Sequence, residues 1–196
     1  MLENLDTRER IMEAAMMVLA ERGYSGAGVQ EIVKRSASSK GSFYFHFPSK
    51  EKMVTALVDR MMEKLVYKVE LSIASESTPL DRLVAGIEVL MRTFSEQRKI
   101  AQILLLNVMG HGNAMDKKFI PIWERLSGLI RVELDQAVKH QQIRATDTEL
   151  VSLVWLGALH QVIVRWLVTG QPEPLISCVR ELQAILLRSV GVYRDL

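Results

Sequence analysis

The chain has 196 residues, 48% of them hydrophobic, which is enough to bury a substantial core. Its 25 Lys and Arg residues nearly balance its 23 Asp and Glu residues, so the net charge of +2 does not by itself indicate a polyanionic partner. The single cysteine, Cys178, excludes an intrachain disulfide and is typical of a reducing compartment. The N-terminal sequence MLENLDTRER lacks the apolar stretch of a signal peptide, so we expect a cytoplasmic protein.

Three short helices are predicted within the first 48 residues. Apolar residues at helical spacing over 11–19 predict the first, which Gly23 is expected to end. A second helix begins after Gly28, and the polar run SASS at 36–39 separates it from the segment SKGSFYFHFPSK at 39–50. We therefore expect closely spaced helices and no sheet in this part of the chain.

The aromatic residues of 39–50 alternate as in a strand, but the tract is too short and too closely flanked by helices to pair as one. At helical spacing, Phe43 and Phe47 share one face while Lys40 and Tyr44 share another. Positions 34–52 also hold five basic residues against one acidic residue, a possible phosphate footprint. A helix, a polar turn and a helix with basic and aromatic residues outward are typical of a helix-turn-helix.

The remaining periodicity is also helical, and we expect an all-α protein. Ser49 is expected to cap a long helix over about 50–72, and a break or kink is expected at Pro121. The apolar span 150–168 has the length of a membrane helix, but His160, Gln161 and Arg165 favour the central helix of a core and no membrane. The later helices are expected over about 79–94, 98–109, 115–141, 147–169 and 174–190.

Residues 8–60 resemble the N-terminal DNA-binding domain of the TetR family of bacterial regulators. The family's usual run is a Gly-aromatic pair, an Ile-Ala pair and, after a turn, Ser-x-Gly-x-x-Tyr-x-x-Phe-x-x-Lys. The chain reads GYSGAGVQEIVKRSASSKGSFYFHFPSKEKM at 23–53 and keeps this spacing. The matching residues are Gly23, Tyr24, Ile32, Ser39, Gly41, Tyr44, Phe47 and Lys50.

Three residues depart from the family's pattern. Gly28 stands where the family often has a threonine that caps the second helix. Ala37 stands where the family has the turn glycine, and Ser38 replaces the apolar residue that follows. If Ala37 is left-handed, its conformation costs roughly 1–2 kcal/mol.

The resemblance implies which residues contact DNA. The recognition helix, about 39–45, is expected in the major groove, with Lys40, Ser42 and Phe45 on base edges and Gly41 allowing a close approach. Phosphate contacts are expected from Ser39, Tyr44, His46 and Lys50, with Gln30 and Lys34 as weaker candidates on the second helix. The alternative role of Tyr44 and His46 is packing of the small domain.

The resemblance further implies two domains, 1–52 for DNA binding and 53–196 for ligand binding and dimerisation. Helices 147–169 and 174–190 are expected to form a four-helix bundle with a second copy. The effector is expected to be small and apolar or amphipathic. The candidate ligand-binding residues are Met91, Phe94, Met109, His111, Phe119, Trp123, Trp155, His160 and Arg165, each of which has plain core or interface packing as its alternative.

We therefore expect a DNA-binding transcriptional regulator, most often a repressor in this family, that binds a palindromic operator as a homodimer. The alternative is a helical adaptor that binds protein without sequence-specific DNA contacts. An enzyme is not expected, because the chain has no phosphate loop or nucleophile elbow, and no cofactor is expected. The four histidines, His46, His111, His140 and His160, lack metal-ligand spacing.

Overall fold

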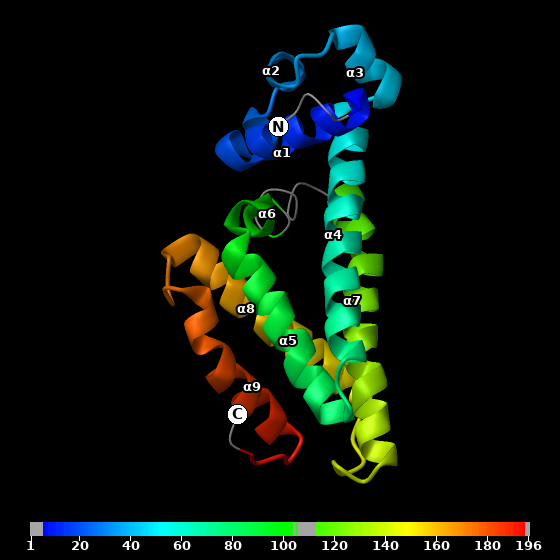
Figure 1. Cartoon of the computed structure of the whole chain (residues 1–196), viewed down its shortest axis with the longest axis vertical. Coiled ribbons are helices and arrows are strands. Elements are labelled where there is room, and N and C mark those ends of the chain that lie inside the picture. Colours follow the sequence, from blue (N-terminus) through cyan, green and yellow to red (C-terminus); the bar gives the residue numbers. More distant parts are fainter. Residues whose placement is uncertain (1–5, 104, 106–112, 195–196) are drawn as a thin grey trace. The chain divides into compact units, whose positions relative to one another are not determined.

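The computed structural model describes residues 6–103, 105 and 113–194, and every element assigned within them is a helix (Figure 1). The all-α prediction is confirmed. The chain divides into two compact units, one of residues 1–63 with 99–115 and one of residues 64–98 with 116–196. The helix α4 (Lys50–Ala74) begins in the first unit and continues into the second.

The first unit contains α1 (Thr7–Gly26), α2 (Val29–Arg35), α3 (Lys40–His46) and the start of α4. Side-chain oxygens cap these helices: Asp6 accepts from the Glu9 amide at 2.8 Å and Ser39 from the Ser42 amide at 3.0 Å. Gly23 does not end α1 as predicted but kinks it (φ 66°, ψ 179°), and the helix continues to Gly26. The core of this unit buries Ile11, Ala15, Leu19, Ile32, Phe43 and Phe47.

The turn between α2 and α3 is built around Ala37, which has a positive φ of 49°. The Ser38 amide donates to the Val33 carbonyl at 3.1 Å, the pattern of a Schellman cap that places its left-handed residue at Ala37. The Ser36 and Ser38 hydroxyls lie 2.7 Å apart and hydrogen-bond to each other across the turn. The left-handed backbone that glycine would adopt without strain is therefore present with alanine in its place.

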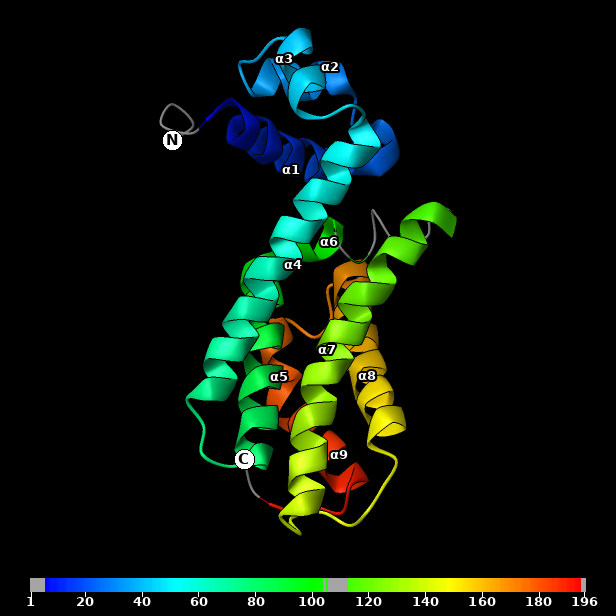
Figure 2. The same cartoon turned by 90° about the vertical axis from the view of Figure 1, so that its right-hand side faces the viewer.

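The second unit contains the rest of α4 with α5 (Pro79–Glu96), α7 (Asn113–Lys139), α8 (Thr148–Thr169) and α9 (Val179–Ser189). Figure 2 shows α5, α7 and α8 lying alongside one another, with α9 behind. The sequence predicted a new helix start or a kink at Pro121; α7 runs through Pro121 as one helix, so the new start is absent. The predicted final helix begins as a 3₁₀ turn, η2 (Leu175–Cys178), which follows Pro174 and precedes α9.

The short helix α6 (Arg98–Gln102) follows α5. It occupies the start of the helix predicted over 98–109, and 104 and 106–112 lie outside the described residues. Arg98 lies over the Trp166 ring at 4.6 Å and donates to the Leu167 carbonyl at 3.1 Å. Its positive charge therefore satisfies a carbonyl near the C-terminal end of α8.

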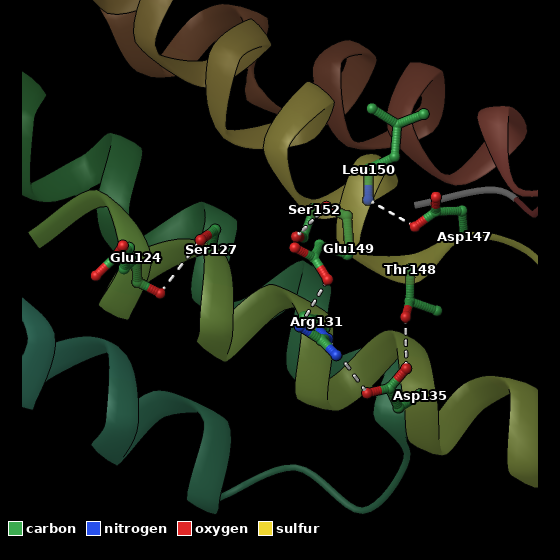
Figure 3. Close-up of polar contacts among 9 residues, drawn as sticks. All are labelled: Glu124, Ser127, Arg131, Asp135, Asp147, Thr148, Glu149, Leu150 and Ser152. Carbon is green, nitrogen blue, oxygen red and sulfur yellow. Dashed lines mark hydrogen bonds and ion pairs between the residues drawn. The ribbon is translucent and has the colours of Figure 1, made fainter. Parts of the chain in front are cut away.

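Polar contacts tie the start of α8 to α7 (Figure 3). Asp147 caps α8 by accepting from the Leu150 amide at 3.0 Å. The Thr148 hydroxyl donates to Asp135 at 2.5 Å, and Arg131 donates to Glu149 at 3.1 Å. These groups are exposed, so each contact contributes little stability.

The helix α8 has the length and mean hydropathy of a membrane span. Its side chains at helical spacing, including Trp155, Leu159 and Ile163, are nevertheless buried within the second unit, and Trp155 donates to the Ser189 hydroxyl of α9 at 3.0 Å. This burial identifies α8 as a core helix, as the sequence predicted.

We predict that Ala37→Gly stabilises the protein by about 1 kcal/mol, because glycine removes the left-handed strain at the cost of some unfolded-state entropy. Urea unfolding followed by circular dichroism measures the change. The matched control is Ala145→Gly in an exposed loop without a positive φ, where glycine should lower stability instead. A loss of stability in both variants would contradict the strain at Ala37.

Candidate nucleic-acid interface and apolar cavity

The side chains of α3 divide between a buried face and an exposed face. Phe43 and Phe47 are buried with 0% and 3% of their surface exposed, and they anchor α3 to the core of the first unit. Phe45 is 84% exposed and Tyr44 45% exposed, although both are aromatic. Two large rings held in water leave an apolar and hydrogen-bonding surface available to a partner.

The residues predicted to contact DNA lie close together on α2, α3 and the start of α4. The His46 ring meets the Phe45 ring edge-on at 5.1 Å, so the two rings form one continuous surface at the end of α3. Ser42, His46 and Lys50 are half-buried. The exposed members of the set are Gln30, Lys34, Ser39, Lys40, Gly41, Tyr44 and Phe45.

Lys50 is committed to a contact within the protein. Its ammonium group donates to the Tyr24 carbonyl and lies 4.4 Å from the centre of the Tyr24 ring. The Tyr24 carbonyl follows the kink at Gly23, where the regular helix ladder is interrupted. Partial burial lowers the pKa of Lys50. An ammonium has three donors, so Lys50 can tie α1 to α4 and still present N–H groups outward.

Part of the basic surplus at 34–52 is neutralised within the first unit. Arg35 donates to Glu21 at 2.7 Å and lies 3.8 Å from Glu31. The hydrogen bond from Arg35 lowers the pKa of Glu21, and the same bond raises the pKa of Arg35. The field toward a polyanion therefore comes from Lys34, Lys40 and Lys52 more than from Arg35.

The structure adds Arg8, which the sequence patterns did not single out. Its guanidinium lies over the Phe47 ring, 5.3 Å from the ring centre, at the end of α3. Arg8 belongs to α1 and is distant in sequence from α3, so helical periodicity gave no signal for this contact. The contact places another positive charge next to Phe47, at the C-terminal end of α3.

The second unit encloses an apolar cavity between α4, α5, α7 and α8, with about 430 Å³ of space that atoms do not fill. Part of this space is open to solvent, so the enclosed part of the cavity is narrow. Its polar groups are Arg82 and Glu133, whose side chains form an ion pair at 3.1 Å. The remaining lining residues are aliphatic except for one glycine: Val69, Ile73, Leu83, Gly86, Ile87, Leu90, Leu126, Leu129, Ile130, Leu156 and Leu159.

The residues predicted to bind a ligand, where the structure describes their side chains, do not line this cavity. Met91, Phe94 and Trp155 are buried core residues, and Arg165 is exposed. None of these four lines the cavity. Met109 and His111 lie outside the described residues, and so does the side chain of Phe119. The cavity is lined mainly by branched aliphatic residues of α4, α5, α7 and α8.

Trp123 and His160 pack against each other where α7 meets α8. Their rings meet edge-on with centres 5.0 Å apart. The Nε2 atom of His160 is buried and has no hydrogen-bond partner among the described residues, and burial lowers the pKa of His160 from 6.5. The neutral imidazole is therefore the form that fits this site.

We predict that Lys50→Met lowers the free energy of unfolding by about 1 kcal/mol, because the Tyr24 carbonyl loses a charged donor while the apolar stem is retained. Thermal unfolding measures the effect. Lys52→Met, at an exposed position on the same helix, is the control and should change stability little. Equal stability of the two variants would contradict a structural tie at Lys50.

We also predict that His160 makes stability fall at acid pH. Because the folded-state pKa lies below the unfolded value of 6.5, the unfolded chain binds more protons between the two values, and stability is lost as pH falls through them. The slope is at most about 1.4 kcal/mol per pH unit. Denaturant unfolding of wild type, His160→Phe and the exposed-site control His140→Phe between pH 7.5 and 5 tests this. An unchanged pH slope in His160→Phe would contradict it.

Comparison with known proteins agrees with this architecture. Residues 11–57 match the family model described as "Bacterial regulatory proteins, tetR family". Over 182 residues the chain is 20% identical to the "Fatty acid metabolism regulator protein" of Bacillus subtilis (strain 168), covering 92% of this chain and 94% of the relative. It is 34% identical over 91 residues to the "HTH-type transcriptional regulator LmrA" of the same organism, covering 46% of this chain and 48% of LmrA.

Among solved structures, the fold is similar to that of the transcriptional regulator FadR from Bacillus subtilis in complex with stearoyl-CoA. The TM-score is 0.86 at 20% identity, covering 93% of this chain and 97% of that one. These relatives are transcriptional regulators and not enzymes, and they do not favour an adaptor without DNA binding. The helix-turn-helix of α2 and α3 lies within residues 11–57, and this match identifies that segment as a DNA-binding domain of the TetR family of bacterial transcriptional regulators.

Proposed function

We propose that this protein is a cytoplasmic repressor that binds a palindromic operator as a homodimer and releases it when a fatty acyl thioester occupies the apolar cavity. The observation that carries the proposal is the narrow, almost wholly aliphatic cavity between α4, α5, α7 and α8. The division into a DNA-binding domain, 1–52, and a ligand-binding and dimerisation domain, 53–196, is part of the same proposal.

The exposed face of α3 supports the DNA-binding part. Lys40, Ser42 and Phe45 are assigned to base edges in the major groove, where a lysine can donate to guanine and a ring can meet a thymine methyl group. Ser39, Tyr44, His46 and the remaining donors of Lys50 are assigned to phosphates. Gln30 and Lys34 on α2 are assigned weaker contacts to the phosphate backbone of the duplex.

The surface of α8 supports a homodimer. Leu150, Val154 and Val168 are exposed although α8 is a core helix on its other side, and Ile185 of α9 is exposed as well. The first two are four residues apart, and Gly157 continues the stripe three residues later, where an added Cβ would meet open space. Such a stripe on two adjacent helices suits an isologous four-helix contact with a second copy.

The chemistry of the cavity supports an acyl chain as the effector. An alkyl chain gains free energy by leaving water for an aliphatic lining, at about 25 cal/mol for each Å² buried. A narrow cavity favours a thin, flexible chain over a fused aromatic ring system. The similarity to a fatty acid metabolism regulator and to a FadR structure with stearoyl-CoA points to the same class of ligand.

The helix α4 supports a route from ligand to DNA. Its Met53 and Val54 are buried in the first unit, while Val69 and Ile73 line the cavity. A ligand that binds one packing of the cavity more tightly shifts the population toward it, and each tenfold preference corresponds to about 1.4 kcal/mol. Since α4 holds both sets of residues, a change in the packing of the cavity also shifts α4, the helix that directly follows α3.

The proposal predicts that dodecanoyl-CoA releases the protein from its operator, obtained by selection from random DNA, whereas CoA without an acyl chain does not. Fluorescence anisotropy of the duplex measures release. Gly86→Leu should bind DNA normally but lose most of the response, because its side chain fills the cavity. Gly128→Leu, on α7 outside the lining, should respond like wild type. A response to dodecanoyl-CoA that survives in Gly86→Leu would refute the cavity as the effector site.

A further inference from the structure

The polar end of the cavity carries no net charge, although it contains a cation. Among the described residues that line the cavity, Arg82 and Glu133 are the two charged ones, and the Arg82 Nη1 atom donates to the Glu133 Oε2 atom at 3.1 Å. The side chain of Glu133 is 10% exposed and that of Arg82 is 29% exposed. A ligand therefore meets a neutralised guanidinium with its counter-ion already in place.

Arg82 also fixes where the polar end lies. Its Nε atom donates to the Glu76 carbonyl at 3.0 Å and its Nη2 atom to the Ser77 carbonyl at 3.2 Å. Both carbonyls belong to the exposed loop between α4 and α5, so this end of the cavity lies beside solvent. A guanidinium has five N–H donors, and three are used in these bonds, which leaves two for a ligand oxygen.

We propose that Glu133 makes the cavity selective for a neutral acyl group, such as a thioester, over the free carboxylate of the same chain length. This inference rests on the proposed acyl effector. A thioester carbonyl can accept from the spare Arg82 donors without disturbing the ion pair. A carboxylate at the same place adds a second negative charge beside the buried Glu133 carboxylate. Arg82 supplies only one positive charge for the two carboxylates, so they repel each other.

The rival role for the pair is purely structural, as a link between α5 and α7. A second ion pair serves as a control for that role. Glu70 of α4 pairs with Arg125 of α7 at 3.2 Å and so links two helices as well. These side chains are 42% and 54% exposed, and neither lines the cavity. Glu70→Gln therefore removes a similar cross-helix ion pair without changing the charge of the cavity.

The test compares the affinities of two probes by isothermal titration calorimetry at pH 7.5. The first is S-dodecanoyl-N-acetylcysteamine, an uncharged thioester without phosphates, and the second is dodecanoate, which carries one negative charge. Wild type should bind the thioester at least about tenfold more tightly than dodecanoate, a difference of about 1.4 kcal/mol. Glu133→Gln should bind dodecanoate about tenfold more tightly than wild type does and keep thioester affinity within about twofold. Glu70→Gln should keep the wild-type ratio.

Each other outcome has a definite meaning. Equal affinity of wild type for the two probes, or a ratio that Glu133→Gln leaves unchanged, overturns the role of Glu133 while leaving the acyl effector intact. Binding of neither probe, together with no binding of dodecanoyl-CoA, overturns the proposed function itself. If Glu133→Gln does not fold by circular dichroism, Arg82→Gln supplies the test, because the uncompensated Glu133 charge should then weaken dodecanoate binding further than thioester binding.

Discussion

The apolar stripe of α4 is buried along nearly the whole helix, from Met53 to Val69. Near its start, Arg60 pairs with Glu9 of α1 at 3.2 Å in the first unit. Near its end, Val69 and Ile73 lie against Gly86 of α5 in the second unit. Burial of this stripe contributes to the hydrophobic stabilisation of each unit. The surface of α3 and the lining of the cavity both depend on this helix, since α3 leads into it and Val69 and Ile73 belong to it.

The elements near the N-terminus could be predicted because their signals are local. Phe43, Phe45 and Phe47 alternate as in a strand, yet the structure buries the first and third and exposes the second, as helical spacing requires. The strain at Ala37 was also visible in advance, because the motif demands a left-handed residue there and the structure has one. Short-range geometry decided both features, and short-range geometry is what a sequence records directly.

The cavity and its ion pair could not be predicted in the same way. Arg82 and Glu133 are 51 positions apart, and no spacing rule pairs residues on different helices. Met91 and Trp155, which were expected to line a pocket, are buried and do not belong to the lining of this cavity. Cavities form where packing is incomplete, and the shape of the gap depends on tertiary arrangement, which propensity and periodicity do not encode. The contact between Lys50 and Tyr24 escaped prediction for the same reason.

In the proposed mechanism, occupation of the cavity and binding of DNA oppose each other within one protein. Linkage requires that the factor by which an acyl ligand weakens DNA binding equals the factor by which DNA weakens binding of the acyl ligand. The most direct measurement is therefore calorimetric titration of dodecanoyl-CoA into the free protein and into its saturated operator complex. Dodecanoyl-CoA should bind the operator complex more weakly than the free protein, by the factor found in the reverse experiment. Equal affinity for the free and DNA-bound protein would contradict it.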